Sequence, residues 1–111
     1  NIPTTLHSDF TMAPAQPLNS AWIAANRISE HGGTLCPEEC LSLDDALKAI
    51  TIEAAYILDM EDEIGSIRAG KKADFAILEQ DPYEVGAKGL KDIPIWGTVF
   101  EGRPFPLQDK R

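Results

Sequence analysis

Residues 65–78 constrain the fold of this chain more than any other stretch. Their sequence indicates a strand, a turn through residues 68–72 and a second strand, and Gly70 can adopt the left-handed backbone that a tight reversal requires. Residues 73–78 are almost entirely apolar, which is typical of a strand covered on both faces. We therefore predict a hairpin of two strands, residues 64–67 and 73–78.

The first half of the chain has the apolar periodicity of helices. Apolar side chains recur at helical spacing in residues 18–28, 43–51 and 52–58, which predicts three helices. Ser42 precedes the second helix and has the acidic Asp45 three positions later, which is the pattern of an N-cap. We expect the third helix to bury the side chains of Ala54, Ala55, Ile57 and Leu58.

Two further strands complete the prediction, at residues 4–7 and 95–100. The helices thus lie in the first half and most of the strands in the second. This segregation suggests two structural units that meet near residues 60–64. We expect Trp22 and Trp96 to lie in the core rather than on a ligand site.

Composition and charge limit the classes of function. The 111 residues suffice for one small domain, and 43% hydrophobic and 25% charged residues are ordinary for a soluble protein. The net charge of −8 argues against a nucleic-acid partner and against an anionic membrane surface, because both are bound mainly through Lys and Arg. No apolar run approaches the roughly 20 residues that span a bilayer, and no signal peptide is recognisable, so we expect a cytoplasmic protein.

Few residues of the sequence are candidates for a catalytic or metal-binding role. Asp9 is the one carboxylate placed like a functional residue, because it lies near the end of the alternating stretch of residues 4–10, just before a loop with Pro14 and Pro17. At a strand end, a carboxylate can bind a divalent metal and shuttle a proton, whereas the structural alternative is an Asx-type hydrogen bond to the following loop. His7 lies on the same face, but it could share a metal only if the strand bends, and a packing role is the alternative.

Other polar residues have structural interpretations. Cys36 and Cys40 form a C-x3-C pair without a second pair of Cys or His, so we interpret them as bystander thiols, with a local disulfide or a metal site as alternatives. We expect Asp74 to be a structural carboxylate that accepts backbone N–H bonds from the turn at residues 70–72.

Several stretches resemble the C-terminal end of metal-dependent amidohydrolases, especially the subgroup related to N-substituted formamide deformylases and exoenzyme-regulatory amidohydrolases. Residues 6–9, Leu-His-Ser-Asp, are similar to the end of the eighth barrel strand, where the family places its last metal-site aspartate. Residues 43–55 resemble a helical segment of the family, and residues 65–75 resemble the stretch where the chain leaves the barrel for a small β-sandwich. Residues 98–103 are similar to the final strand pair.

This resemblance implies a fold class and an activity. The expected fold is an α/β fragment, with the last strand and terminal helices of a (β/α)8 barrel in residues 1–60 and strands of a small β-sandwich domain in residues 61–111. The implied parent enzyme hydrolyses non-peptide carbon–nitrogen bonds, in amides or cyclic amides, with metal-activated water and a small-molecule substrate. The resemblance makes Asp9 a ligand of a divalent metal, expected to be zinc, and the proton shuttle.

The family places its other metal ligands on earlier barrel strands, and only eight residues precede Asp9 here. We therefore expect the isolated chain to hold no metal and to be inactive, because a single carboxylate cannot hold zinc in a closed site. The alternative is a stand-alone small α+β binding or assembly module without catalysis. Under both interpretations, exposed strand edges and apolar helix faces predict self-association.

Overall fold

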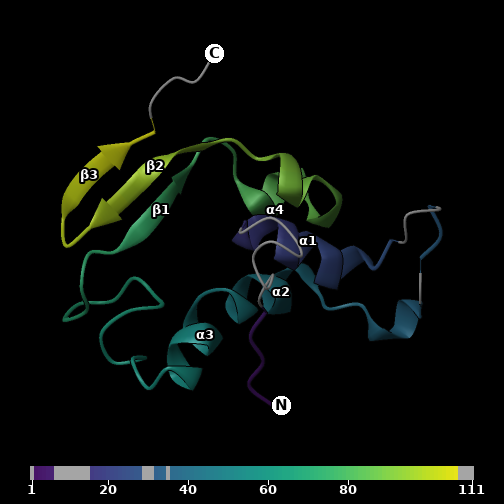
Figure 1. Cartoon of the computed structure of the whole chain (residues 1–111), viewed down its shortest axis with the longest axis horizontal. Coiled ribbons are helices and arrows are strands. Elements are labelled where there is room, and N and C mark those ends of the chain that lie inside the picture. Colours follow the sequence, from purple (N-terminus) through teal and green to yellow (C-terminus); the bar gives the residue numbers. More distant parts are fainter. Residues whose placement is uncertain (1, 7–15, 29–31, 35, 108–111) are drawn as a thin grey trace.

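A computed structural model describes residues 2–6, 16–28, 32–34 and 36–107 of the chain (Figure 1). Short helices occupy one side of the molecule and a three-stranded sheet occupies the other. In chain order the elements are α1 (Pro17–Asn26), η1 (Pro37–Glu39), α2 (Leu43–Ala49), α3 (Ile52–Ile57), β1 (Phe75–Leu78), α4 (Pro82–Val85), η2 (Ala87–Asp92), β2 (Ile95–Phe100) and β3 (Arg103–Pro106).

The three predicted helices are confirmed as α1, α2 and α3, each with ends that differ slightly from the prediction. The predicted N-cap of α2 is also confirmed, because the backbone N–H of Asp45 donates to Ser42 Oγ at 3.1 Å. α1 ends two residues earlier than predicted, since Arg27 adopts a left-handed conformation with φ of 50° and its N–H bonds back to Ile23.

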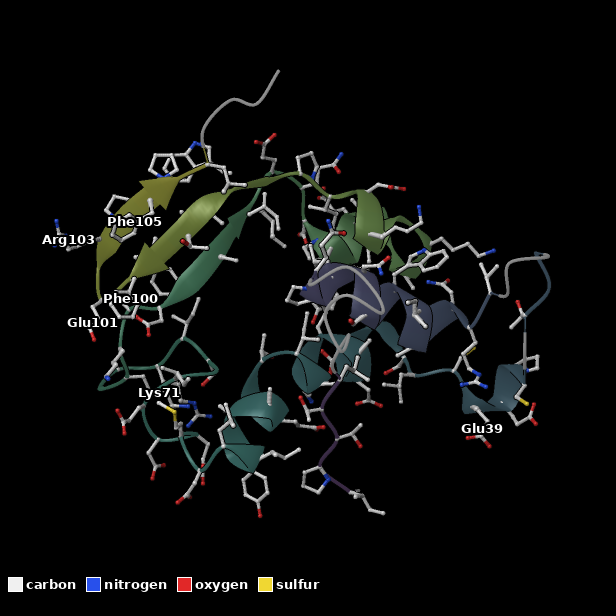
Figure 2. All side chains as sticks on the ribbon, in the orientation of Figure 1. Glu39, Lys71, Phe100, Glu101, Arg103 and Phe105 are labelled. Carbon is white, nitrogen blue, oxygen red and sulfur yellow. The ribbon has the colours of Figure 1, made fainter. Side chains whose placement is uncertain are left out.

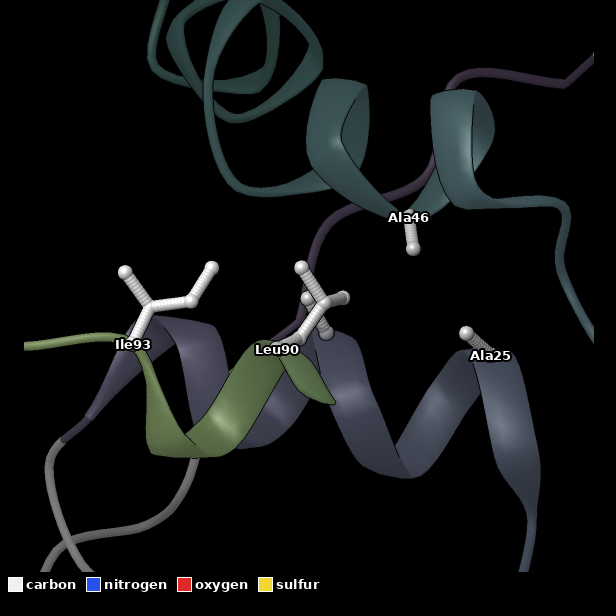
Figure 3. Close-up of a cluster of buried hydrophobic side chains, with 5 residues drawn as sticks. Ala25, Ala46, Leu90 and Ile93 are labelled. Carbon is white, nitrogen blue, oxygen red and sulfur yellow. The ribbon is translucent and has the colours of Figure 1, made fainter. Parts of the chain in front are cut away.

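The hydrophobic core lies where α1, α2 and η2 meet (Figure 3). Leu90 of η2 is fully buried, and it is surrounded by small side chains that allow the helices to approach closely. The fully or nearly buried residues of this cluster are Ala21, Ala25, Ala46, Leu90 and Ile93.

Polar contacts fix η2 on α1. The indole N–H of Trp22 donates to the carbonyl of Lys88 at 2.9 Å, and Lys91 Nζ lies 5.2 Å from the centre of the same ring. The buried amide of Asn26 donates to the carbonyls of Trp22 and Ala87. Trp22 packs against the core as predicted. Residues that follow β1 in the sequence therefore return to the helical side of the molecule.

The burial prediction for α3 is partly wrong. Ala55 is buried and faces Gly65, but Ile57 is 50% and Leu58 66% exposed, at the C-terminal end of the helix. Trp96 is also exposed, at 42%, so its expected core position is wrong. It lies at the irregularity where the register between β1 and β2 shifts.

The sheet is antiparallel with the order β1-β2-β3. A two-residue turn joins β2 to β3, and both of its residues, Glu101 and Gly102, have positive φ values, which suits the right-handed twist of the strands. Gly97 lies at the centre of β2, where a Cβ atom would stand 2.5 Å from the carbonyl oxygen of Phe105. Only glycine allows β3 to approach β2 this closely.

The predicted hairpin of residues 64–67 and 73–78 is wrong. β1 forms within the second range but pairs with β2, and residues 61–66 form turns and bends. Gly65 has a φ of 98° and stands so close to α3 that a Cβ atom would lie 2.8 Å from Ala55 Cβ. Packing on α3 therefore takes this segment away from β1. The expected strand at residues 4–7 is absent from residues 4–6, and residue 7 lies outside the described residues.

Asp74 is a structural carboxylate, but its partner differs from the predicted one. Its Oδ1 atom accepts a hydrogen bond from the backbone N–H of Glu101 at 2.7 Å, in the turn between β2 and β3. The next residue of that turn is also attached, because Gly102 N–H donates to the carbonyl of Ala73 at 3.0 Å. The division into units at residues 1–60 and 61–111 stays a prediction.

Candidate functional site

Asp9, the predicted metal ligand and proton shuttle, lies outside the described residues, as does His7. The described segment before them, residues 2–6, is extended and runs beside α3. The backbone N–H of Thr4 donates to Glu53 Oε1 of α3 at 2.9 Å, and Leu6 is half-buried. The segment that precedes Asp9 in the sequence is thus held by a hydrogen bond to α3, a helix that the sequence correctly predicted.

An open cleft of about 540 Å³ lies between this segment, α3 and residues 61–71. Its lining mixes the ring of Tyr56 and aliphatic side chains with charges of both signs. The lining residues are Pro3, Ile52, Glu53, Tyr56, Glu61, Asp62, Ser66, Arg68 and Lys71. This lining has the mixed polarity of a binding surface.

Two polar side chains of this cleft differ in whether they have hydrogen-bond partners. Lys71 Nζ, which is visible in Figure 2, donates to Ser66 Oγ at 2.8 Å and to the carbonyl of Ile64 at 3.4 Å. Glu61 Oε1 is buried without a hydrogen-bond partner among the described residues. Glu61 lies in the turn that follows α3, and nothing in the sequence indicated that its carboxylate is buried.

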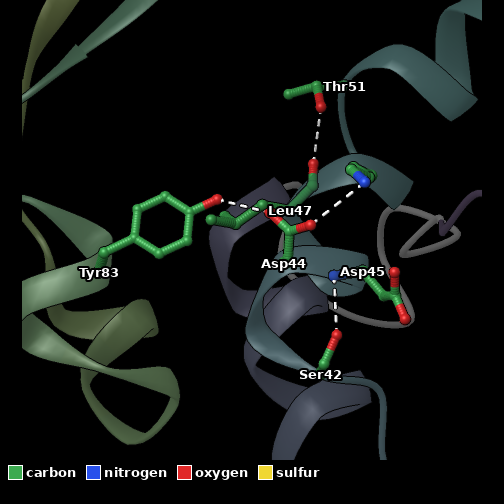
Figure 4. A network of polar contacts seen from close by, with 7 residues as sticks. Ser42, Asp44, Asp45, Leu47, Thr51 and Tyr83 are labelled. Atoms are coloured by element: carbon green, nitrogen blue, oxygen red, sulfur yellow. Dashed lines mark hydrogen bonds and ion pairs between the residues drawn. The ribbon is translucent and has the colours of Figure 1, made fainter.

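A second polar cluster joins α4 to α2 (Figure 4). Tyr83 Oη donates to Asp44 Oδ1 at 2.8 Å, and Lys48 Nζ lies 3.1 Å from Asp44 Oδ2. The hydrogen bond from Tyr83, and then Lys48, lower the pKa of Asp44 below its ordinary value. The same contacts with Asp44 raise the pKa values of Tyr83 and Lys48. This cluster connects two helices. Because all three groups are exposed, it does not enclose a substrate.

A third cluster holds the loop of residues 61–72 against the sheet. Lys72 Nζ lies 3.3 Å from Glu63 and 3.9 Å from Glu101, and these contacts, led by Glu63, raise its pKa. The backbone N–H of Lys72 also donates to the carbonyl of Glu63 at 2.8 Å. This cluster explains how the loop is fixed, and its exposed ion pairs are weak individually.

The described residues do not form a site for a divalent metal. Among them, no three His, Cys, Asp or Glu side chains come together as metal ligands would. Cys36 and Cys40 are both free thiols, so the local disulfide considered for them does not form in this structure. Zinc sites in enzymes use about three protein ligands and a water molecule, and the donor set of these ranges does not fit that requirement.

Comparison with known proteins places the chain in a family. A model of the amidohydrolase family matches residues 1–106, and this chain therefore belongs to that family. N-substituted formamide deformylase from Arthrobacter pascens is 31% identical over 101 residues, which is 91% of this chain and 19% of that protein.

Two further relatives are similar over most of the chain. Imidazolonepropionase from Shewanella baltica (strain OS195) is 34% identical and aligns with 83% of this chain and 22% of its own length. Protein LONG AFTER FAR-RED 3 from Arabidopsis thaliana is 36% identical, over 81% of this chain and 16% of its own length. The chain thus spans about a fifth of the length of these relatives. No solved structure matches it significantly.

None of the helices in the described part of the chain has the length and hydropathy needed for a bilayer crossing.

Proposed function

We propose that this chain is the C-terminal part of a longer hydrolase that cleaves non-peptide carbon–nitrogen bonds in amides or cyclic amides. The observation that carries this proposal is the family match over residues 1–106, combined with coverage of only about a fifth of the relatives. In that protein, the helices would be the terminal helices of a (β/α)8 barrel, and the three strands would belong to a small β-sandwich.

Asp9 is the residue of this chain to which we assign a role in hydrolysis. We propose that it is a ligand of a divalent metal, zinc in our expectation, and that it accepts and returns a proton. The support is its resemblance to the last metal-site aspartate of the family and its place after the segment fixed on α3. Since the described residues bring no set of metal ligands together, we propose that the isolated chain is inactive.

The test compares the 111-residue chain with the longer protein encoded by the same reading frame. We expect only the longer protein to hydrolyse an N-substituted formamide or a cyclic amide. Asp9→Asn should lower its kcat by about 10²–10⁴-fold, the range for loss of a positioned acid or base. The matched control is Asp59→Asn, because Asp59 is exposed at the end of α3. Hydrolysis by the isolated chain, or full activity of Asp9→Asn, would contradict the proposal.

A second candidate function is a small α+β assembly module without catalysis, favoured by the apolar side chains that the sheet exposes. Phe100 is 57% and Phe105 49% exposed, on the part of the sheet away from α1 and α2 (Figure 2). Sedimentation of the isolated chain should show self-association that Phe100→Ser and Phe105→Ser weaken. Titration of the longer protein with zinc in a calorimeter separates the two functions, since only the hydrolase requires a metal.

A further inference from the structure

Residues 2–6, which precede Asp9 in the sequence, are held by a hydrogen bond more than by packing. Ile2 is 87% exposed and the three residues that follow it are also exposed, so this segment buries little apolar surface. The backbone N–H of Thr4 donates to Glu53 Oε1 at 2.9 Å. Within the described ranges, no other hydrogen bond joins this segment to the rest of the chain. Glu53 therefore determines where the segment lies.

Glu53 belongs to a helix that is itself fixed on the core. Thr51 Oγ1, at the start of α3, donates to the carbonyl of Leu47 in α2 at 2.7 Å. Ala46 of α2 is fully buried in the hydrophobic core. The side chain of Glu53 is half-buried in the first turn of α3. It therefore connects residues 2–6 with the best-packed part of the molecule.

A small pocket of about 170 Å³ lies beside this hydrogen bond. Its lining residues are Ile2, Thr4, Leu41, Asp45 and Glu53. Two carboxylates thus lie near the segment, but of these two only Glu53 accepts a hydrogen bond from its backbone. Asp45 lies in the first turn of α2, where its own N–H donates to Ser42. Asp45 is therefore a matched control, because its removal takes away a neighbouring carboxylate and leaves the hydrogen bond of Thr4 intact.

Pro3 makes the hydrogen bond specific for one register of the segment. It has no backbone N–H, so a shift that brings Pro3 to the position of Thr4 loses the bond to Glu53. In a strand, a shift by one residue also exchanges the two faces. The shift that Pro3 opposes would put Ser8 in the position of Asp9, and Ser8 has no carboxylate. The bond to Thr4 thus selects the register in which a carboxylate occupies that position.

We propose that Glu53 is a positioning residue for the proposed hydrolysis, and that its hydrogen bond with Thr4 fixes the register of the strand that leads to Asp9. This inference rests on the proposed function, which makes residues 6–9 the end of a barrel strand and Asp9 the proton shuttle. A carboxylate suits this task, because hydrogen bonds to a charged acceptor are shorter and stronger than those between neutral groups. Proton transfer requires Asp9 within hydrogen-bond distance of its partner, so a small displacement of the strand lowers the rate.

The test measures kcat and KM in the longer protein encoded by the same reading frame. Glu53→Ala removes the acceptor, and we expect kcat to fall about 10–100-fold with KM unchanged, because the outer partners of a site orient the groups that react. Glu53→Gln keeps an acceptor oxygen and should recover most of the lost kcat, and Asp45→Ala should leave kcat unchanged. An unchanged kcat in Glu53→Ala, equal losses in Glu53→Ala and Asp45→Ala, or no recovery in Glu53→Gln would each overturn the inference.

A double-mutant cycle shows whether Glu53 acts through Thr4. Thr4→Pro removes the donor N–H without altering α3, so it also serves as the test if Glu53→Ala does not fold. We expect Thr4→Pro to lower kcat as much as Glu53→Ala does, and the combination of both substitutions to cause no further loss. Losses that multiply would show that the two residues act independently, which would contradict the inference.

Hydrogen exchange of the amides in residues 4–10 adds a readout that does not depend on activity. In the longer protein these amides should exchange at least about 10-fold faster in Glu53→Ala than in Glu53→Gln or the unsubstituted protein, whereas amides around Leu90 should not change. Equal exchange in all three proteins would reject the inference. The proposed function fails separately: a longer protein without hydrolase activity rejects the enzyme and with it the positioning role, whereas an active enzyme with unchanged kcat in Glu53→Ala rejects the positioning role alone.

Discussion

The helical and sheet parts of this molecule differ in how completely each buries its apolar residues. Around Leu90, helices from distant parts of the sequence enclose a small core, and Trp22 and Asn26 fix the contact with hydrogen bonds. The sheet has regular pairing but leaves large side chains exposed on both faces. Backbone pairing, the two-residue turn and the close approach at Gly97 therefore hold the strands together, and the large side chains of the sheet contribute little burial among the described residues.

The largest effect is expected in the helical core. Leu90→Ala removes a fully buried side chain between α1, α2 and η2, and it should lower the free energy of unfolding by about 2–5 kcal/mol. Phe105→Ala on the exposed sheet face is the comparison variant and should cost much less in the isolated chain. Denaturant titrations of both variants measure the difference. Equal costs would show that the sheet is as well packed as the helical core.

The next effect concerns the pairing of β2 and β3. Gly97→Ala places a methyl group against the backbone of Phe105 and Pro106, and the strands must separate to admit it. We expect a loss of about 1–3 kcal/mol, with faster amide exchange at Phe105 and no change around Leu90. Gly33→Ala is the control, because nothing lies near the Cβ position of Gly33. Faster exchange around Leu90 would indicate that the two parts unfold as one unit.

The smallest effect is expected at the exposed contact between α4 and α2. Tyr83→Phe removes the hydrogen bond to Asp44, so the pKa of Asp44 should rise toward its ordinary value of 3.8. A lowered folded-state pKa of Asp44 stabilises the fold above pH 3.8, and this stabilisation is lost as the pH falls through the folded-state pKa.

The raised pKa of Tyr83 contributes stability below pH 10.0, which is lost as the pH rises through its folded-state pKa. The variant should therefore be slightly less stable than the parent between these limits and equal to it in strong acid. A carboxyl titration by NMR and thermal melts across this pH range measure both effects. A pKa of Asp44 that stays unchanged in Tyr83→Phe would show that Lys48 alone lowers it.

Sequence reasoning predicted the local features of this fold better than its long-range pairings. Ser42 predicted the start of α2 because capping depends on residues within one turn. The hairpin prediction failed because the sequence of residues 64–67 cannot show that Gly65 fits closely against Ala55. Pairing of β1 with a strand twenty residues later likewise depends on tertiary contacts. The docking of Lys88 on Trp22 was missed for the same reason.

The candidate site was predicted through family resemblance rather than periodicity. The pattern around Asp9 did not separate a metal ligand from a loop cap, and its assignment came from the resemblance of residues 6–9 to the end of a barrel strand. The comparisons confirm the family over residues 1–106, and the role of Asp9 stays a prediction. A metal site assembled from strands distant in sequence cannot be deduced from a segment that supplies one ligand.

Pro104 and Pro106 also determine how far misassembly of this chain can proceed. An open-ended fibril requires each molecule to offer two competent edges, so that growth continues at both ends of the stack. Here the proline-bearing edge cannot donate hydrogen bonds at these two positions, and an aberrant stack that begins at β1 ends at the first pair of molecules. Pro104 and Pro106 thus limit cross-β growth of this chain.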